Sequence, residues 1–297
     1  MQTPNETPSQ NANSQSTGGY QDSGPANITK YIQVGQNPRI LIPPGGLNCD
    51  ILMIGGGAGA NSGGGGAGAC IVAIGQTLPS GRCVIFVGNG GGQYTNGGDS
   101  SISVGGITRY LAKGGGTGGG VNANGTDGGC GGGAGVLNGR TTNYDGGSAV
   151  ATNIVNGIPS GPSATSTYAV FGNRGGHQRS TTGKSPSGDY AYPGGGGGIG
   201  SPGQDNIQGN ANAGNGGSGL NAATINGITY NFKQHFGVDG FIGGGGAGSD
   251  GVGKNTGANG LNGSTKFNTI LPANTGSGGN GAFGAGSSGI VIIRVRT

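Results

Sequence analysis

The sequence predicts an all-β protein, a jelly-roll-like β-sandwich with glycine-rich polyglycine II-type segments. Mainly apolar runs of four to six residues, rich in Ile and Val, recur along the chain at 51–54, 70–74, 83–87 and 290–295. That length and composition suit a buried strand and are too short for a helix. Glycine tracts separate the runs, and no apolar period of 3.6 residues is visible.

Glycine supplies 80 of the 297 residues, against a usual share of about 7%. Collagen is excluded, because there is no sustained Gly-X-Y period. Each ordered glycine costs roughly 0.5–1 kcal/mol more than alanine. A core formed from 31% hydrophobic residues therefore needs further stabilising interactions to offset this cost. We expect glycine segments to hydrogen-bond backbone to backbone as polyproline II-type helices, and further surface to be buried against partner subunits.

The strand signals continue along the chain without a linker, so we expect one glycine-rich β domain over residues 28–297. Residues 1–27 form a polar N-terminal arm of Gln, Asn, Ser, Thr and Pro. Such an arm cannot bury a core of its own. We therefore expect it to be ordered only against neighbouring subunits.

The strands are expected in the following order. Residues 28–34 and 39–42 come first, and a Pro-Pro-Gly-Gly turn at 43–46 separates them from the run that begins at Asp50. The runs 70–74 and 82–87 follow, and Gly105-Gly106 predicts a hairpin between 101–104 and 107–112. Residues 225–232 are strand-like around Asn226-Gly227. The last strand, 290–295, is apolar on both faces, so we expect it to be central and to close the sheet against an early strand.

Residues 138–192 differ from the rest, because glycine thins out and Tyr, Arg and His appear. We expect a surface insertion there, either a recognition loop or a solvated spacer. Aromatic and Arg side chains are frequent interface anchors. The candidate contacts with a partner or receptor are Tyr144, Tyr168, Phe171, Arg174, Arg179, Tyr190 and Tyr192.

Motifs that resemble catalytic or cofactor sites have simpler explanations. The glycines at 63–68 satisfy GxGxxG, but a second β-run follows where a dinucleotide fold needs a helix. The sequence TGKS at 182–185 lacks the first glycine of a P-loop and a buried strand before it. His177 and His235 have no readable triad partners, and we expect His235 to pack in a surface loop. We predict no catalytic, cofactor-binding or metal-binding residue, and no enzymatic activity.

The four cysteines, Cys49, Cys70, Cys83 and Cys130, lie far apart and form no CxxC pair. We expect small buried side chains, although a disulfide remains open. The net charge of +4 is spread thinly, without the basic run that nucleic-acid binding would need. The longest apolar run is too short to span a membrane, and the polar N-terminus predicts no signal peptide.

The ordered series of segments resembles the glycine-rich domain proteins of large DNA viruses and of phage tails. The segments are DILMIGGGAGA, GGGGAGACIVA, LPSGRCVIFVGNGGG, GGDSSISVGGITRYLAKGGG, YPGGGGGIGSPG, INGITYNF, FIGGGGAGSDG and GSSGIVIIRVR. The similarity covers residues 28–297 except 138–192.

The resemblance implies a non-enzymatic role in the virion. It suggests a minor capsid or fibre component that contacts other virion proteins, as a homo- or hetero-oligomer. The alternative is a receptor-binding adhesin at a tail or fibre tip, which packs polyglycine helices and presents loops to a host surface receptor. The absence of Trp and the few aromatic residues in the loops favour the capsid or fibre role. An ice-binding protein would need regular Thr or Gly-X-X faces, which the irregular spacing does not support.

Overall fold

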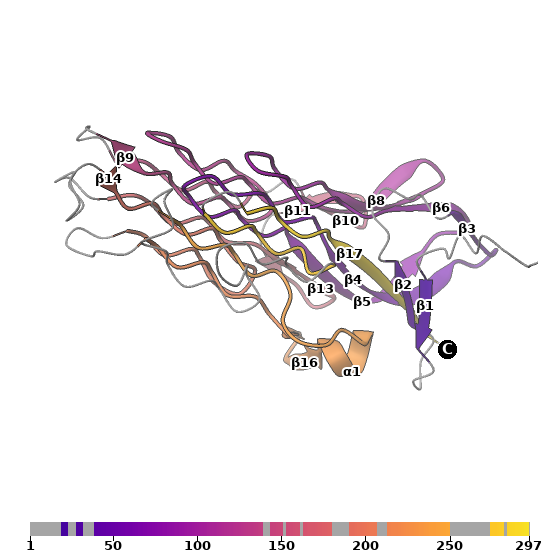
Figure 1. The fold of residues 1–297 in the computed structure, drawn as a ribbon. Coiled ribbons are helices and arrows are strands. Elements are labelled where there is room, and N and C mark those ends of the chain that lie inside the picture. The colour runs from indigo at the N-terminus through magenta and orange to yellow at the C-terminus, as the bar shows by residue number, and fades with distance from the viewer. Residues whose placement is uncertain are drawn as a thin grey trace, which may run out of the picture.

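The computed structural model describes residues 19–22, 28–31, 39–138, 143–150, 153–160, 163–179, 190–206, 213–249, 274–281 and 284–296. A β-sandwich lies at one end, and glycine-rich segments run side by side away from it (Figure 1). We call these segments the glycine bundle. It consists of residues 55–69, 88–99, 113–136, 143–149, 172–179, 193–206, 213–219, 243–249, 274–281 and 284–289.

The larger sheet has seven strands in the order β1-β2-β17-β4-β5-β13-β12, and each described pair is antiparallel. Their bounds are β1 Gly19–Asp22, β2 Ile28–Tyr31, β4 Leu47–Ile54, β5 Cys70–Leu78, β12 Ser163–Ala164, β13 Tyr168–Phe171 and β17 Ile290–Val295. The last strand, β17, lies between β2 and β4 and places Ile292 opposite Leu52. The expected central position of the closing strand is therefore confirmed.

The second sheet has six strands in the order β11-β10-β8-β7-β6-β3. Their bounds are β3 Arg39–Ile42, β6 Gly81–Phe86, β7 Ser100–Val104, β8 Ile107–Ala112, β10 Asn153–Val155 and β11 Ile158–Ser160. The turn between β7 and β8 has Gly105 and Gly106 at φ +61° and +82°, which confirms the predicted hairpin. The two packed antiparallel sheets confirm the all-β sandwich.

Two hydrophobic cores explain why the main strands are apolar on both faces. Ile51, Met53 and Val291 face the six-stranded sheet, in a core that also holds Ile85 and Ile102. Their neighbours in sequence point to the other face of the seven-stranded sheet, in a second core that includes Leu52, Ile54, Val72 and Ile292. Since β4 and β17 are covered on both faces, an alternating apolar and polar pattern would leave polar groups buried there.

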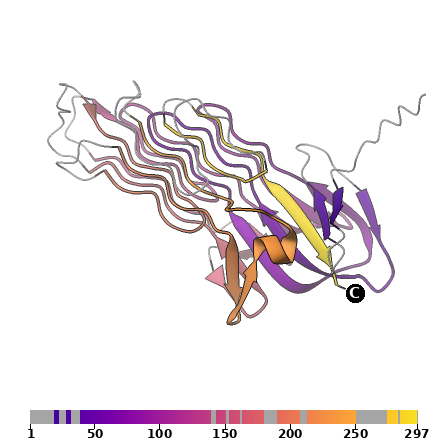
Figure 2. The same cartoon turned by 60° about the horizontal axis from the view of Figure 1, so that its bottom comes forward.

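A small hairpin and a short helix cover the second core. The hairpin is β15 (Ala222–Ile225) with β16 (Ile228–Asn231), and α1 (Phe232–Phe236) follows directly. The Asn231 side chain accepts from the N–H groups of Lys233 and Gln234, while Gly237 ends the helix at φ +63°. Phe232 and Phe236 pack into the second core, and Figure 2 shows the helix beside the last strand. The expected loop around His235 is therefore a capped helical turn.

The predicted surface insertion, residues 138–192, is partly built into both sheets. Strand β13 pairs with β5, and β10 pairs with β8, so both belong to the sandwich. Residues 143–149 and 172–179 belong to the glycine bundle, and β9 (Leu137–Asn138) pairs with β14 (Tyr190–Ala191). The local loss of glycine thus reflects strands as well as surface loops. Within the predicted N-terminal arm, Gly19–Asp22 forms β1, and the rest of the arm lies outside the described residues.

Backbone hydrogen bonds in the glycine bundle repeat every three residues. The N–H groups of Gly55 and Ala58 donate to residues 69 and 66, and those of Gly56 and Gly59 donate to residues 98 and 95. Those of Gly57 and Ala60 donate to residues 287 and 284. One segment is thus bonded to three different neighbours in turn. A period of three is that of a polyproline II-type helix.

The close approach of these backbones explains the glycine content. A Cβ atom added at Gly56 would lie 1.9 Å from the carbonyl oxygen of Asn89, and one at Gly57 would lie 1.9 Å from that of Ser277. No side chain fits at such a distance unless the neighbouring backbone moves. Glycine is therefore required at these positions by packing, not by an unusual φ angle.

Candidate functional site

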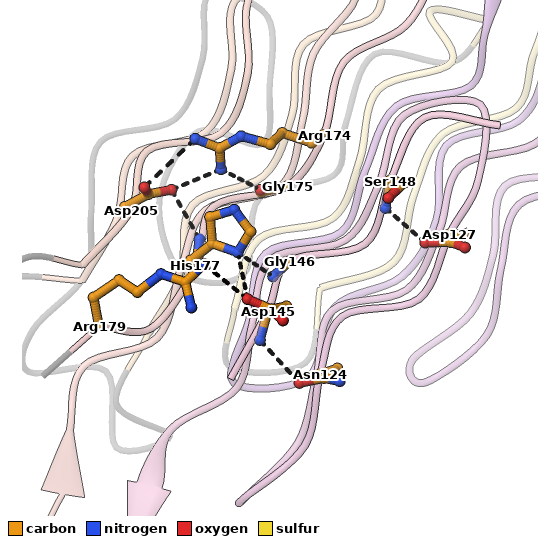
Figure 3. A network of polar contacts seen from close by, with 10 residues as sticks. All are labelled: Asn124, Asp127, Asp145, Gly146, Ser148, Arg174, Gly175, His177, Arg179 and Asp205. Atoms are coloured by element: carbon orange, nitrogen blue, oxygen red, sulfur yellow. Dashed lines mark hydrogen bonds and ion pairs between the residues drawn. The ribbon is translucent and has the colours of Figure 1, made fainter. Parts of the chain in front are cut away.

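Three of the seven predicted contact residues come together in the glycine bundle. Residues 143–149 and 172–179 lie side by side, and Tyr144 and Gln178 exchange backbone hydrogen bonds of 3.2 and 2.9 Å. Arg174 and Arg179 lie on the second of these segments, where both are exposed. With Asp145, His177 and Asp205 they form a group that we call the charged cluster (Figure 3).

The four predicted aromatic contacts other than Tyr144 lie elsewhere. Tyr168 and Phe171 are on β13, where Tyr168 packs against the core between the sheets and Phe171 against the second core. Tyr192 is buried, with 6% of its surface exposed. Tyr190 begins β14, and its side chain lies outside what the structure describes. Tyr168, Phe171 and Tyr192 thus contribute to the interior, and Tyr168 and Phe171 remain partly exposed.

Arg174 and Asp205 make the first half of the charged cluster. The Arg174 Nη1 atom lies 2.7 Å from Asp205 Oδ1, and Nη2 lies 3.4 Å from Oδ2. Nη1 also donates to the carbonyl oxygen of Gly175 at 2.9 Å, and the His177 N–H donates to Asp205 Oδ1 at 2.9 Å. Burial alone would raise the pKa of Asp205, but the hydrogen bonds from Arg174 and His177 hold it below its usual value.

Asp145 makes the second half. Its Oδ1 atom lies 2.8 Å from Arg179 Nη2 and 3.0 Å from His177 Nδ1. The Gly146 N–H lies 3.2 Å from the same Nδ1 atom. Nδ1 accepts from Gly146 only when unprotonated and donates to Asp145 only when protonated, so the two contacts are alternatives. Burial and the neighbouring charges of Arg174 and Arg179 lower the pKa of His177. The lowered pKa favours the uncharged imidazole, and Asp145 is in an ion pair with Arg179.

At part of the bundle surface, polar side chains accept hydrogen bonds from backbone N–H groups. The spacing is three residues, as it is for the backbone hydrogen bonds inside the bundle. Asp99 and Asn96 accept from the N–H groups of Gly114 and Thr117, at 2.9 Å each. Asp127 and Asn124 accept from those of Ser148 and Asp145, at 2.6 and 2.9 Å (Figure 3). We call Asn96, Asp99, Asn124 and Asp127 the acceptor rim. Each takes the place of a carbonyl group from a further segment.

The sequence carries a signal for this rim that we did not use. Asn96 and Asp99, and again Asn124 and Asp127, are three residues apart in glycine-rich sequence. Asn and Asp side chains bond readily to nearby backbone N–H groups. A spacing of three puts both side chains on one side of a polyproline II-type segment. The pattern therefore predicts acceptors aimed at one neighbouring segment.

A second cluster, which the sequence analysis missed, is buried beneath α1. The Asp50 side chain has no exposed surface, and its Oδ1 accepts from the Gly75 N–H at 2.7 Å and pairs with Arg296 Nε at 2.8 Å. Its Oδ2 lies 2.9 Å from His235 Nε2 and 3.0 Å from Arg294 Nη1. A carboxylate next to the apolar run of β4, with one arginine in the last strand and another just after it, was the available signal.

The Asp50 cluster holds three elements together. Burial would raise the pKa of Asp50, but the hydrogen bonds from His235 and Gly75 and the charge of Arg296 lower it. The carboxylate thus stays ionised and connects β4 to α1 and β17. All its oxygens are engaged, and it is closed to solvent. We regard it as structural, and the charged cluster, whose Asp145 and arginines are exposed, as the candidate functional site.

The chemistry available at the charged cluster is that of recognition. It offers guanidinium and carboxylate groups at the surface and an uncharged imidazole. Within the described part of the chain, no group of three or more His, Cys, Asp or Glu side chains is arranged to hold a metal ion. The described cysteines are free and buried, and burial raises the pKa of Cys83 to about 11.

Comparison with known proteins places the chain in no family. No family model matches the sequence, and no curated protein matches it. A search of the described residues for a helix long and apolar enough to cross a membrane finds none.

Proposed function

We propose that this chain is a non-enzymatic structural protein of a virus particle, a fibre or minor capsid component that contacts other virion proteins. The observation that carries the proposal is the glycine bundle. Its segments are bonded to several neighbours through the backbone, and they extend away from the sandwich as one body (Figure 1). An elongated body of this kind can hold other proteins apart and contact them along its length. The resemblance to glycine-rich virion proteins supports the same role.

The sandwich is the natural attachment end in this proposal. Strands β1, β2 and β17 lie together in the seven-stranded sheet, at the opposite end of the molecule from β9 and β14 (Figure 1). Contacts made by the sandwich would leave the far end of the bundle projecting. Partner subunits, whether copies of this chain or other virion proteins, would then supply the additional buried surface that a glycine-rich chain needs.

Mass spectrometry of purified particles tests the proposal. We expect the chain at a fixed copy number relative to the main shell protein, retained through density-gradient purification and salt washing. Its position then follows from antibody labelling against the sandwich. Absence from washed particles, with the protein present in infected cells, would contradict a virion role.

A receptor-binding adhesin is the second candidate, and the position of the charged cluster favours it. Residues 172–179 lead away from β13, and at about 3.1 Å per residue they carry Arg179 roughly 20 Å from the sandwich. Arg179 and Asp145 are exposed there, with Asp145 side chain 60% accessible. Recognition by such groups would be polar and sensitive to salt.

Cell binding separates the two candidates. Purified chain that binds host cells, and loses binding when Asp145 and Arg179 both become Ala, would support the adhesin. The matched control replaces Lys233 and Asp239 with Ala, an exposed ion pair beside α1 at 3.3 Å. Equal loss with both double variants, or no cell binding at all, would leave the fibre or capsid role.

A further inference from the structure

The outer face of the six-stranded sheet carries a row of apolar side chains. Phe86 lies opposite Ser101, Ser101 opposite Leu111, and Leu111 opposite Ile154, so the row crosses four strands. Their neighbours Ile85, Ile102 and Tyr110 point the other way, into the core. Phe86, Leu111 and Ile154 are each partly exposed. The sheet therefore shows apolar surface on the face turned away from its core.

Arginine side chains border this row. Arg39 lies opposite Val84, and Arg82 lies opposite Leu41, which is 79% exposed on the edge strand β3. Arg39 and Arg82 are exposed, and neither is in an ion pair with a described residue. Arg109 on β8 is likewise unpaired among the described residues, and its buried Nε atom has no hydrogen-bond partner there.

The chain carries fewer carboxylates than cations, with 10 Asp and Glu against 14 Lys and Arg. Among the Asp side chains that the structure describes, Asp50 is buried, four others are in ion pairs, and Asp127 is exposed without one. The pairs are Asp99 with Lys113, Asp145 with Arg179, Asp205 with Arg174 and Asp239 with Lys233, and Asp127 accepts from Ser148. The net charge of +4 therefore favours a different, acidic protein over a second copy of the chain as the partner of this face.

We propose that the outer face of the six-stranded sheet binds an acidic segment of a different protein that also carries apolar side chains. The arginines select carboxylates, and the row of Phe86, Leu111 and Ile154 selects apolar groups between them. Nucleic acid would match the charge and leave the apolar row uncovered. The proposed function enters this inference at one point only: it places the partner in the same virus particle.

A designed peptide tests the surface without knowledge of the partner. The probe is a short fluorescent peptide of alternating Glu and Leu, compared by anisotropy with the same peptide carrying Lys for Glu. We expect the full chain to bind the acidic peptide, more weakly as salt increases, and not the basic one. The double variant Arg39→Glu/Arg82→Glu should weaken binding by at least about tenfold.

Two further variants define the result. Leu41→Ser should also weaken binding, because it removes an exposed apolar contact and leaves every charge in place. Lys233→Glu on α1 carries a matched charge reversal away from the sheet and should leave binding unchanged. Because Arg39, Leu41 and Arg82 are exposed, their substitution should leave the far-ultraviolet spectrum and the melting temperature as in the parent protein.

Several outcomes would overturn the proposal. These are equal binding of the acidic and basic peptides, no binding of the acidic peptide at millimolar concentration, or no effect of either sheet variant. Binding to vesicles of anionic lipid that is lost in the double variant would reassign the face to membranes. A dimer in sedimentation that the double variant abolishes would reassign it to a second copy.

This test and the test of the virion role fail independently. If the peptide does not bind, particles can still contain the chain, and the docking face alone is wrong. If particles lack the chain, the peptide result still holds, and the partner must be sought elsewhere. Where both succeed, a photoreactive amino acid at position 41 in assembled particles should cross-link a segment of another protein rich in Asp or Glu.

Discussion

Asp50 shows how one polar residue can decide the arrangement of three elements. A carboxylate with no exposed surface is costly unless cations and hydrogen bonds replace its water. Here Arg294 reaches it from β17, Arg296 from just after β17, and His235 from α1. Because these residues are far apart in the sequence, the cluster forms only when the sheet and the covering helix are both in place.

Replacing Asp50 with Asn should destabilise the fold by about 3 kcal/mol, because the cations around it lose their counterion in a buried site. Urea denaturation measures the change. The control is Asp239→Asn in the exposed pair with Lys233, where the side chains are 81% and 67% accessible. That variant should stay within about 0.5 kcal/mol of the parent.

The same residue makes stability depend on pH in a defined direction. The folded-state pKa of Asp50 is lower than its unfolded-state value, which is about 3.9. Its contribution is therefore complete above that value and is lost as the pH falls through the folded-state pKa. The free energy of unfolding of Asp50→Asn should fall less steeply below pH 4 than that of the parent. Parallel curves would contradict the role given to the carboxylate.

His177 offers a direct probe of the charged cluster. Its pKa is lowered by burial and by the charges of Arg174 and Arg179. The variant Arg179→Gln removes one of these charges and frees Asp145 to favour the imidazolium, so the pKa of His177 should rise. Titration followed by NMR of the imidazole measures it. Arg39→Gln, on the six-stranded sheet, should leave the titration unchanged.

At the scale of elements, strands and glycine segments follow different rules. The strands are set by Ile and Val side chains that fill the two cores, and their positions could be predicted from the sequence. The glycine segments are set by backbone contacts so close that a Cβ would overlap a neighbouring carbonyl group. Whether glycine is required at a given position therefore becomes clear only when its neighbours in space are known.

Gly59 and Gly92 form a matched pair for testing this rule. A Cβ at Gly59 would lie 1.9 Å from the carbonyl oxygen of Gly92, whereas one at Gly92 would meet nothing closer than Thr95 Oγ1 at 3.8 Å. We expect Gly59→Ala to cost about 3 kcal/mol or more, since backbone must move. Gly92→Ala should be neutral or stabilise by up to about 1 kcal/mol. Equal effects of the two substitutions in thermal unfolding would contradict this rule, because they would show that the backbone around Gly59 moves to accept a Cβ atom.

The elements that the sequence analysis missed depend on distant partners. A five-residue helix gives no periodic signal, and α1 exists because Asn231 and Gly237 cap it and because Phe232 and Phe236 fill a core made by other strands. Likewise β13 has a short apolar run, and its place beside β5 depends on pairing across nearly one hundred residues. Of the charged cluster, Arg174 and Arg179 were named as candidate contacts, whereas Asp145, His177 and Asp205 were not.

The whole molecule combines two sources of stability. In the sandwich, apolar side chains are removed from water, while in the bundle each residue contributes mainly a backbone hydrogen bond. The fold class and the glycine packing could be inferred from composition and run length. The direction of the bundle and the neighbours of each segment could not, because glycine tracts are nearly identical and offer no side chains that would distinguish them.

Insertions should reveal the three-residue period of the bundle. One glycine added between Gly65 and Gly66 rotates the following N–H groups by a third of a turn, away from Gly116 and Gly197. Three added glycines restore the direction and shift the contacts along the axis by about 9 Å. We expect the single insertion to lower the melting temperature more than the triple one. The reverse order, with both proteins folded, would contradict a threefold period.

The acceptor rim has a consequence for how these molecules behave in a crowd. A flank of glycine backbone with free N–H groups is a template on which another chain can add, as happens at an open sheet edge. Asn96, Asp99, Asn124 and Asp127 occupy such groups with side chains of the same molecule. They act as terminators of lateral polymerisation. A chain with more than a quarter of its residues glycine can thus stay discrete where silk-like sequences of similar composition would form fibres.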